Sequence, residues 1–413
     1  MGSNPIPRII FLKMKFYIET YGCTANQGDS KKIEALLKEK GYTKVESESD
    51  ADTIVINTCI VTKRTELNVL KRLRKVGKEK NLIVAGCLPA AQPNLISNIL
   101  DCGSSIETVT PDLLNSTFDY EPDGVIGTAN ISNGCVGNCS YCTVKSARGN
   151  LVSYSPKDIS DAVKNLVRKG AKEVRITSQD CSAYGIDTNL RLPDLIKDLT
   201  SVKGDFKMRV GMMNPTTMMD IQNELVDAFN HHKVFKFLHV PVQSGSNRIL
   251  DLMNRNYEIS DFLNIINRFR TKFPDITIST DFIIGFPSET EEDFNKSLDL
   301  LKSIKSEKVN ITRFSLRPNT KAADMKDMPD RIKKERSRIF TSVYHEIALE
   351  MNKKWEGKIL EVVVTERGKK GGVISRDQTY KNIVIKEDID LGDHRRVKIT
   401  KAKASYLVSE VVS

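Results

Sequence analysis

Residues 133–142 read Asn-Gly-Cys-Val-Gly-Asn-Cys-Ser-Tyr-Cys, which places three cysteines with the spacing C-x3-C-x2-C on one short stretch, at Cys135, Cys139 and Cys142. Cysteine thiolates are the usual protein ligands of iron–sulfur clusters, so three of them on one loop can hold three irons of a cubic cluster. No fourth cysteine follows at short range. The spacing therefore predicts a cluster whose fourth iron stays open to a ligand that is not protein.

A zinc knuckle, or three cysteines that share a loop by chance, would produce the same spacing. Structural zinc normally takes four Cys or His ligands, however, and no histidine lies near this loop. The sequence therefore favours the cluster over zinc.

The composition indicates a globular protein of two to three domains with an anionic partner. The chain has 413 residues and a net charge of +10, which suggests nucleic acid, although a merely solvated basic surface is the alternative. Eight cysteines are too few for a disulfide scaffold and point to reduced thiols in a cytoplasmic protein. No apolar run approaches the roughly 18–20 residues of a membrane span, so no membrane partner is expected.

Residues 14–125 are predicted to form an α/β domain in which three successive strands each end in a cysteine. The strands are expected at residues 15–23, 53–59 and 81–87, ending in Cys23, Cys59 and Cys87. Helical spacing separates them, and the second helix is expected to bury one stripe formed by Leu67, Leu70, Leu73 and Val76. Strands that alternate with helices predict a parallel sheet, which binds ligands beyond the carboxyl ends of its strands.

The three strand-end cysteines could thus meet at one rim and hold a second cluster. Three separate buried core cysteines are the alternative, because free cysteine is commonly buried. Their equivalent positions on three strands favour the cluster. The remaining two cysteines, Cys102 and Cys181, are expected to be structural, with a position facing the mouth of the central barrel as the alternative for Cys181.

Residues 126–350 are predicted to form a barrel or partial barrel of about six β/α units. After the strand that precedes Cys135, strand-like runs recur at residues 173–180, 207–214, 237–244, 277–286 and 309–317. Chemistry in such barrels lies at the carboxyl ends of the strands. Polar residues gather there, at Ser178, Gln179, Asp180, Asn214, Gln243, Ser244 and Arg317. Local signals also predict a capping box formed by Ser288 and Glu291.

Residues 353–413 are predicted to form a small β barrel of the oligonucleotide-binding kind, with five short strands separated by glycine turns. From residue 352 onward the chain has 14 Lys and Arg against 9 Asp and Glu, a net charge of +5. This charge suits RNA phosphates. A cap domain that only aids solubility is the alternative.

Together these parts resemble the radical S-adenosylmethionine (SAM) methylthiotransferases, and the tail resembles that family's TRAM module. The resemblance covers nearly the whole chain from Met14. It depends on Tyr21-Gly22-Cys23, Asn57-Thr58-Cys59, Gly86-Cys87, the C-x3-C-x2-C loop, Arg148-Gly149, Gln243-Ser244-Gly245 and Gly285-Phe286-Pro287. The phrase Arg209-Val210-Gly211-Met212-Met213-Asn214-Pro215 is similar to the archaeal and eukaryotic branch, which acts on N6-threonylcarbamoyladenosine at tRNA position 37.

The resemblance implies SAM and two 4Fe-4S clusters as cofactors. One cluster, on Cys135, Cys139 and Cys142, would split SAM into methionine and a 5′-deoxyadenosyl radical, and the other would supply sulfur for a methylthio group on C2 of the adenine. Tyr141 fits the family's aromatic residue before the last cysteine. Gly285 lies in an element that packs beside the adenine of SAM. Ser178, Gln179 and Asp180 stand where the family usually has Gly-Gly-Glu, which leaves the SAM contacts open.

The remaining expectations concern partners and alternatives. The tRNA anticodon stem-loop is the expected macromolecular partner, together with an electron donor and a sulfur source of unidentified nature. Arg148 and Arg317 are candidates for substrate or cofactor contacts. Two alternatives stay open: methylthiolation of an aspartate on a ribosomal protein, and a non-catalytic iron–sulfur protein that binds RNA.

Overall fold

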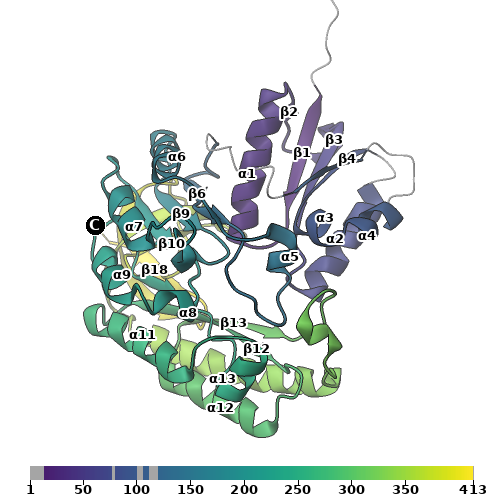
Figure 1. Ribbon diagram of the computed structural model, residues 1–413. Coiled ribbons are helices and arrows are strands. Elements are labelled where there is room, and N and C mark those ends of the chain that lie inside the picture. The colour runs from purple at the N-terminus through teal and green to yellow at the C-terminus, as the bar shows by residue number, and fades with distance from the viewer. Residues whose placement is uncertain (1–13, 77–79, 100–105, 111–119, 413) are drawn as a thin grey trace, which may run out of the picture.

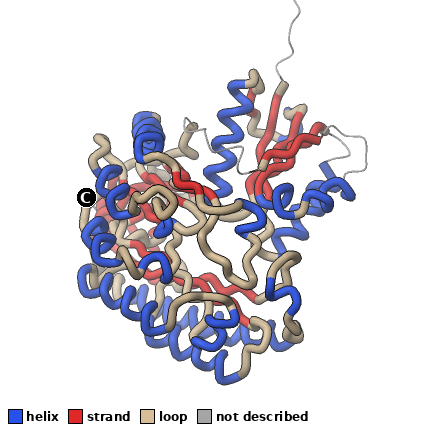
Figure 2. Tube along the Cα trace, in the orientation of Figure 1, coloured by secondary structure: helices blue, strands red, loops and turns tan. Residues whose placement is uncertain are grey.

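The computed structural model describes residues 14–76, 80–99, 106–110 and 120–412, and places the three predicted parts of the chain side by side (Figure 1). In the central part, strands form the inside and helices lie outside them (Figure 2). No helix in the described part of the chain is long and apolar enough to cross a membrane.

The N-terminal part is a five-stranded sheet in the order β2-β1-β3-β4-β5, and every neighbouring pair is parallel. Its strands are β1 (Lys15–Thr20), β2 (Thr43–Lys44), β3 (Thr53–Thr58), β4 (Asn81–Gly86) and β5 (Ile106–Val109). Its helices are α1 (Thr24–Glu39), α2 (Lys63–Val76), α3 (Cys87–Ala91) and α4 (Pro93–Ile99). All six residues of β3 are buried, as expected for a β-branched strand with neighbours on both sides.

The stripe predicted for α2 was partly wrong. Leu67 is exposed, while Glu66 and Val69 are buried together with Leu70 and Leu73. The buried positions follow the 3.6-residue period from Glu66, and Glu66 is buried because it has a charged partner in the central part.

The central part is the predicted partial barrel, made of two three-stranded parallel sheets in the orders β6-β9-β10 and β11-β12-β13. A parallel bridge between Met208 and Val234 lies where β10 approaches β11. The strands are β6 (Ile126–Asn130), β9 (Glu173–Thr177), β10 (Lys207–Val210), β11 (Phe237–His239), β12 (Thr277–Ile284) and β13 (Lys308–Arg313).

Helices cover the outside of this barrel. The main ones are α6 (Pro156–Arg168), α7 (Leu192–Thr200), α9 (Gln222–Phe229), α11 (Ile259–Lys272), α12 (Glu291–Ile304) and α13 (Asp330–Lys353). The capping box of α12 is formed by Thr290 and Asp293, not by Ser288 and Glu291 as predicted. Ser288 instead has a φ of +67° in the preceding turn, so it cannot be the extended N-cap residue.

The C-terminal part is a closed barrel with the order β14-β15-β16-β18-β17, which confirms the five predicted strands. These are β14 (Ile359–Arg367), β15 (Val373–Arg376), β16 (Ile383–Ile385), β17 (His394–Ala402) and β18 (Leu407–Val411). Trp355, the single tryptophan of the chain, packs in its core.

The C-terminal barrel docks on the amino ends of the central strands. The Gln378 amide donates to the carbonyl of Val234 at 2.7 Å, and Tyr380 Oη donates to Glu173, the first residue of β9. Lys308, the first residue of β13, donates to the carbonyl of Tyr380 at 3.0 Å. The C-terminal barrel, yellow in Figure 1, therefore closes one end of the central barrel, opposite the carboxyl ends of the strands.

We expect this docked interface to become more stable as the pH rises. Burial, and then the nearby cations Arg376, Arg209 and Lys381, lower the pKa of Lys308 to about 7. Above pH 7 the unfolded chain keeps a proton that the folded chain has lost, so this group adds about 2 kcal/mol to the free energy of unfolding between pH 7 and 9. Trp355 fluorescence in urea, measured at both pH values, should show the increase.

The variant Lys308→Met should show a smaller increase with pH than the wild type, whereas the exposed control Lys302→Met should behave like the wild type. A pH dependence unchanged in Lys308→Met would contradict the prediction.

Candidate active site

The three cysteines of the 133–142 stretch lie at the carboxyl ends of the central strands. Backbone N–H groups point at two of the sulfurs: Gly137 donates to Cys135 Sγ at 3.2 Å and Val144 to Cys142 Sγ at 3.4 Å. Arg255 Nη1 donates to Cys139 Sγ at 3.4 Å. Each of the three sulfurs therefore accepts a hydrogen bond. Such hydrogen bonds help set the reduction potential of an iron–sulfur cluster.

Burial keeps the thiols of Cys59, Cys135 and Cys142 protonated at neutral pH. It raises the pKa of Cys59 and of Cys135 to about 11, and that of Cys142 to about 12. Because only thiolates bind iron, loading either site must release protons.

The three strand-end cysteines lie near Asn26, and their role as ligands of a second cluster stays a prediction. Cys23 Sγ and Cys87 Sγ each lie 3.9 Å from Asn26 Oδ1, so these two sulfurs are at most about 8 Å apart. Cys59 lies beside Gly22, whose φ is +108°; a Cβ there would be only 2.8 Å from Cys59 Sγ. Glycine is therefore required at position 22 both for its backbone conformation and for its contact with this cysteine.

Asn26 also joins the strand ends themselves. Its Nδ2 donates to the carbonyls of Tyr21 and Thr58, both at 2.8 Å. Neither Asn26 nor Arg255 was predicted as a site residue. Asn26 occurs three residues after Cys23 at the start of a helix, which is a usable signal, whereas Arg255 lies in a turn with no motif.

Arg148 links the two cysteine sites. It lies on α5 (Val144–Arg148), directly after the 133–142 stretch, and α5 packs against α3, which begins with Cys87. Its guanidinium donates to Asp29 at 2.6 Å and to Asn26 Oδ1 at 2.7 Å. Burial alone lowers the pKa of Arg148, but Asp29 and the nearby Cys87 and Cys23 raise it overall, so the side chain stays charged.

Among the described residues, no three His, Cys, Asp or Glu side chains are close enough together to hold one metal ion. A zinc ion needs every ligand atom about 2.3 Å or less from one point, whereas each cysteine of a cubic cluster binds a different iron. This absence therefore concerns single ions, and the assignment of the six cysteines as cluster ligands stays a prediction.

Of the residues predicted to contact SAM, Asp180 is fully engaged within the protein. Its carboxylate accepts hydrogen bonds from Ser182, the backbone of Asn214 and Thr217, at 2.7–3.1 Å. Burial raises its pKa. Gln179 differs, because its buried Oε1 has no hydrogen-bond partner in the described structure, and it is the better candidate for a ligand contact.

The other predicted SAM residues mostly shape loops. Ser178 and Ser244 each accept a backbone N–H two residues ahead, and Asn214 caps the short helix α8 (Pro215–Met218). Gln243 has a φ of +69° and is bridged to β12. Tyr141 packs edge-on against Phe286, with ring centroids 6.3 Å apart.

The Cα of Gly285 packs against the side chain of Lys333. The φ of Gly285 is +76°, and a Cβ there would lie 2.3 Å from Cγ of Lys333 on α13. The glycine is thus required by the neighbouring helix, and its predicted role beside the SAM adenine stays a prediction.

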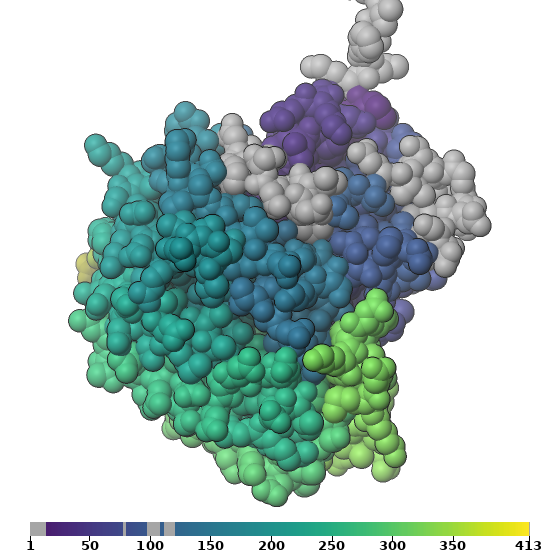
Figure 3. All heavy atoms as spheres, viewed as in Figure 1, coloured from purple at the N-terminus to yellow at the C-terminus, as the bar shows by residue number. Residues whose placement is uncertain are grey.

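Arg317 ties the central barrel to the N-terminal part. It follows β13 and forms a buried ion pair with Glu66 of α2. In Figure 3 the green segment after β13 lies directly against the N-terminal part, coloured purple to blue. The substrate contacts predicted for Arg148 and Arg317 stay predictions, since in the structure both side chains pair with carboxylates.

The structural cysteine Cys181 is fully buried in the barrel core, as expected, whereas Cys102 lies outside the described residues.

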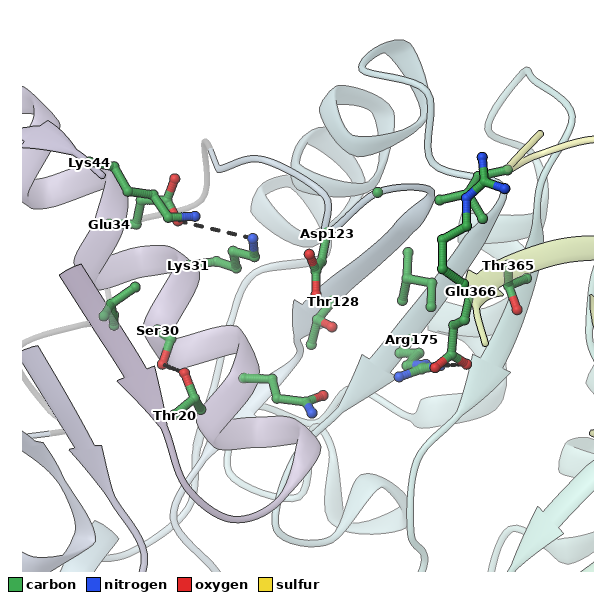
Figure 4. Close-up of a pocket in the computed structure, with 16 residues that line it drawn as sticks. Thr20, Ser30, Lys31, Glu34, Lys44, Asp123, Thr128, Arg175, Thr365 and Glu366 are labelled. Carbon is green, nitrogen blue, oxygen red and sulfur yellow. Dashed lines mark hydrogen bonds and ion pairs between the residues drawn. The ribbon is translucent and has the colours of Figure 1, made fainter. Parts of the chain in front are cut away.

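A cavity of about 500 Å³ lies where the three parts of the chain meet (Figure 4). Lys31 and Lys44 from the N-terminal part, Arg175 from β9 and Glu366 from β14 are among its lining residues. Its cations lie beside acids, as Lys44 does beside Glu34 at 3.3 Å and Arg175 beside Glu366 at 3.7 Å. None of the six predicted cluster cysteines lines it, so it is separate from the candidate active site.

Comparison with known proteins now defines the class. The radical SAM superfamily matches residues 129–301, the uncharacterized protein family UPF0004 matches residues 15–104, and the TRAM domain matches residues 353–412. Among solved structures, the radical S-adenosylmethionine methyltransferase TsrM from Kitasatospora setae shares the fold, with a TM-score of 0.53 over 75% of each chain at 11% identity.

Curated relatives are similar over almost the full length. A probable threonylcarbamoyladenosine tRNA methylthiotransferase from Archaeoglobus fulgidus is 38% identical over 97% of this chain and 99% of its own, and one from Pyrococcus horikoshii is 36% identical over 97% and 100%. The human threonylcarbamoyladenosine tRNA methylthiotransferase is 31% identical over 100% of this chain and 76% of its own. The chain therefore belongs to the radical-SAM methylthiotransferase family, on the branch of the threonylcarbamoyladenosine tRNA enzymes. Membership implies SAM and two 4Fe-4S clusters as cofactors.

Proposed function

We propose that this enzyme adds a methylthio group to C2 of N6-threonylcarbamoyladenosine at tRNA position 37, with SAM as both the radical source and the methyl donor. The main support is the junction at Arg148, which lies six residues after Cys142 and beside Cys23 and Cys87. Two cysteine trios on adjacent elements suit a reaction in which one site activates a C–H bond and the other provides sulfur.

A radical route fits this substrate because C2 of adenine has no acidic proton for a base to remove. SAM and the two clusters, when bound, would supply that radical and sulfur-transfer chemistry. The protein's part is to hold and orient them. Cys135, Cys139 and Cys142 would ligate one cluster and Cys23, Cys59 and Cys87 the other.

Side chains next to the cysteines would keep both sites in position. Asn26 fixes the strand ends that carry Cys23 and Cys59, Arg255 donates to Cys139, and Gln179 Oε1 is available to a SAM contact. Such outer partners commonly matter almost as much as the ligands.

The anticodon stem-loop of tRNA is the proposed macromolecular substrate, with the C-terminal barrel as one RNA contact. A loop nucleotide suits the site because unpaired bases can be turned out and reached on their edges, whereas stacked bases in a helix cannot.

The anaerobically reconstituted enzyme should convert tRNA that carries N6-threonylcarbamoyladenosine into its 2-methylthio derivative. Mass spectrometry of the nucleosides would detect the added methylthio group, and SAM labelled in its methyl group would place the label in the product. A tRNA with N6-dimethylallyladenosine is the control, because a relative from Aquifex aeolicus named for that nucleoside is 33% identical.

Conversion of the dimethylallyl tRNA alone would reassign the nucleoside. Methylthiolation of a ribosomal-protein aspartate but of neither tRNA, or RNA binding without any SAM cleavage, would overturn the proposal.

A further inference from the structure

Helix α2 carries the most concentrated basic charge in the N-terminal part. It has six Lys and Arg against one acid, Glu66, within the 14 residues Lys63–Val76. That net charge of +5 equals the excess of the whole C-terminal barrel. Five of the six cations are exposed, and they define the basic face of α2: Lys63, Arg64, Lys71, Arg74 and Lys75.

Apart from Lys63, which pairs with Glu66 at 3.7 Å, the basic face lacks the acidic partners that other surface helices provide. On α6 and α12, Lys164, Lys296 and Lys302 each pair with an acid of the same helix at 2.7–3.4 Å. Arg64 and Lys71 on α2, by contrast, have no ion pair or hydrogen bond from their side chains within the described structure, and neither do Arg74 and Lys75. The single acid, Glu66, is buried against Arg317.

The first turn of α2 also works against helix stability. Lys63 and Arg64 occupy the positive end of the helix dipole, where acidic residues stabilise a helix and cations destabilise it. Glu66 in the same turn offsets this only for Lys63, with which it pairs at 3.7 Å. For Arg64, which has no such partner in the described structure, the helix dipole gives no stabilising reason for this position, whereas an anionic ligand would.

The position of α2 connects its charge to the candidate active site. The helix begins four residues after Cys59, and Glu66 in its first turn pairs with Arg317, which follows the carboxyl end of β13. Arg64 and Lys75 lie on one stripe about 16 Å long, which can follow several phosphates of a strand.

The C-terminal barrel cannot supply these local contacts. It closes the amino ends of the central strands, whereas the 133–142 cysteines lie at the carboxyl ends. The two ends are separated by the length of the central strands, roughly 17–20 Å for the five to six residues of β6, β9 and β13. A nucleotide at the cysteines needs cations on its own side of the molecule.

We propose that the basic face of α2 binds the sugar–phosphate backbone of the RNA loop that contains the target adenosine. This inference rests on the proposed function and extends it: α2 holds the loop beside the cysteines, and the C-terminal barrel contacts a more distant part of the RNA.

The test compares three variants that each lose three positive charges. The first is Arg64→Gln/Lys71→Gln/Lys75→Gln on α2, and the second is Arg396→Gln/Lys398→Gln/Lys401→Gln on the exposed side of β17. The third, Lys164→Gln/Lys296→Gln/Lys302→Gln, lies on the outer helices and controls for net charge. Binding of a 17-nucleotide anticodon hairpin and of the full tRNA is measured by fluorescence anisotropy from 50 to 200 mM salt, with circular dichroism to check folding.

The α2 variant should bind the hairpin at least tenfold more weakly than the wild type, with a salt dependence reduced by about one per lost cation. The β17 variant should lose affinity for full tRNA but little for the hairpin, and the outer-helix control should match the wild type. Equal hairpin binding by the α2 variant and the wild type would overturn the inference.

Two other outcomes would also decide against it. If the α2 variant bound RNA normally but was reduced more slowly by an acidic electron-transfer protein, and not by dithionite, α2 would be a docking face for that protein. If the wild type bound neither the hairpin nor the full tRNA, the proposed function itself would fail. That outcome is distinct from a failure of the α2 inference, in which the wild type and the α2 variant bind the hairpin equally.

Discussion

Cys135→Ala is expected to abolish reductive cleavage of SAM, whereas Cys59→Ala is expected to spare some cleavage and to stop methylthiolation. Cys135 is one of three ligands on a single loop, so its loss leaves that site with two thiolates and no stable cluster. Cys59 belongs to the other trio, which gathers around Asn26 on the N-terminal sheet. The two substitutions should therefore separate radical formation from sulfur transfer.

Iron and sulfide counting, together with chromatography of 5′-deoxyadenosine and of the nucleoside products, would measure both effects. Cys181→Ala is the matched control, since Cys181 is fully buried in the barrel core and belongs to neither trio. It should retain the iron content and both activities. Full thiolation of RNA by Cys59→Ala with an intact radical site would show that the division of roles is wrong.

Arg148→Gln is expected to cost about 3–5 kcal/mol of stability and to lower the iron content of the N-terminal site. The reason is that Asp29, with 4% of its side chain exposed, would keep a buried charge without its partner. Arg148 also donates to Asn26 and, at 3.0 Å, to Asn133 at the start of the 133–142 stretch, so both cysteine sites would loosen.

Urea unfolding of the iron-free chain and iron counting after reconstitution would test this separately from activity. Lys145→Gln on the same helix is the control, because Lys145 is exposed. In the double variant Arg148→Gln/Asp29→Asn, part of the lost stability should return, because no unpaired charge remains buried. If Arg148→Gln unfolded like the control, the buried pair would not stabilise the junction.

The sequence alone determined the order of the strands and helices and which six cysteines are the candidate cluster ligands. Strands and helices could be located because their signals are local: β-branched runs for strands such as β3, a Ser-Pro start for α6, and glycine turns in the C-terminal barrel. The rule that parallel strands bind ligands at their carboxyl ends was enough to predict that Cys23, Cys59 and Cys87 would gather.

Only the tertiary structure decided which side chains surround those cysteines and where the C-terminal barrel sits. Asn26 and Arg148 are 122 residues apart, and Glu66 and Arg317 are 251 apart, so no local pattern could pair them. A buried charge is stable only beside its partner, and that partner is chosen by packing between domains. The basic charge of the C-terminal barrel could be counted in the sequence. Its position at the amino ends of the central strands, away from the cysteines, depends on long-range contacts such as that between Tyr380 and Glu173.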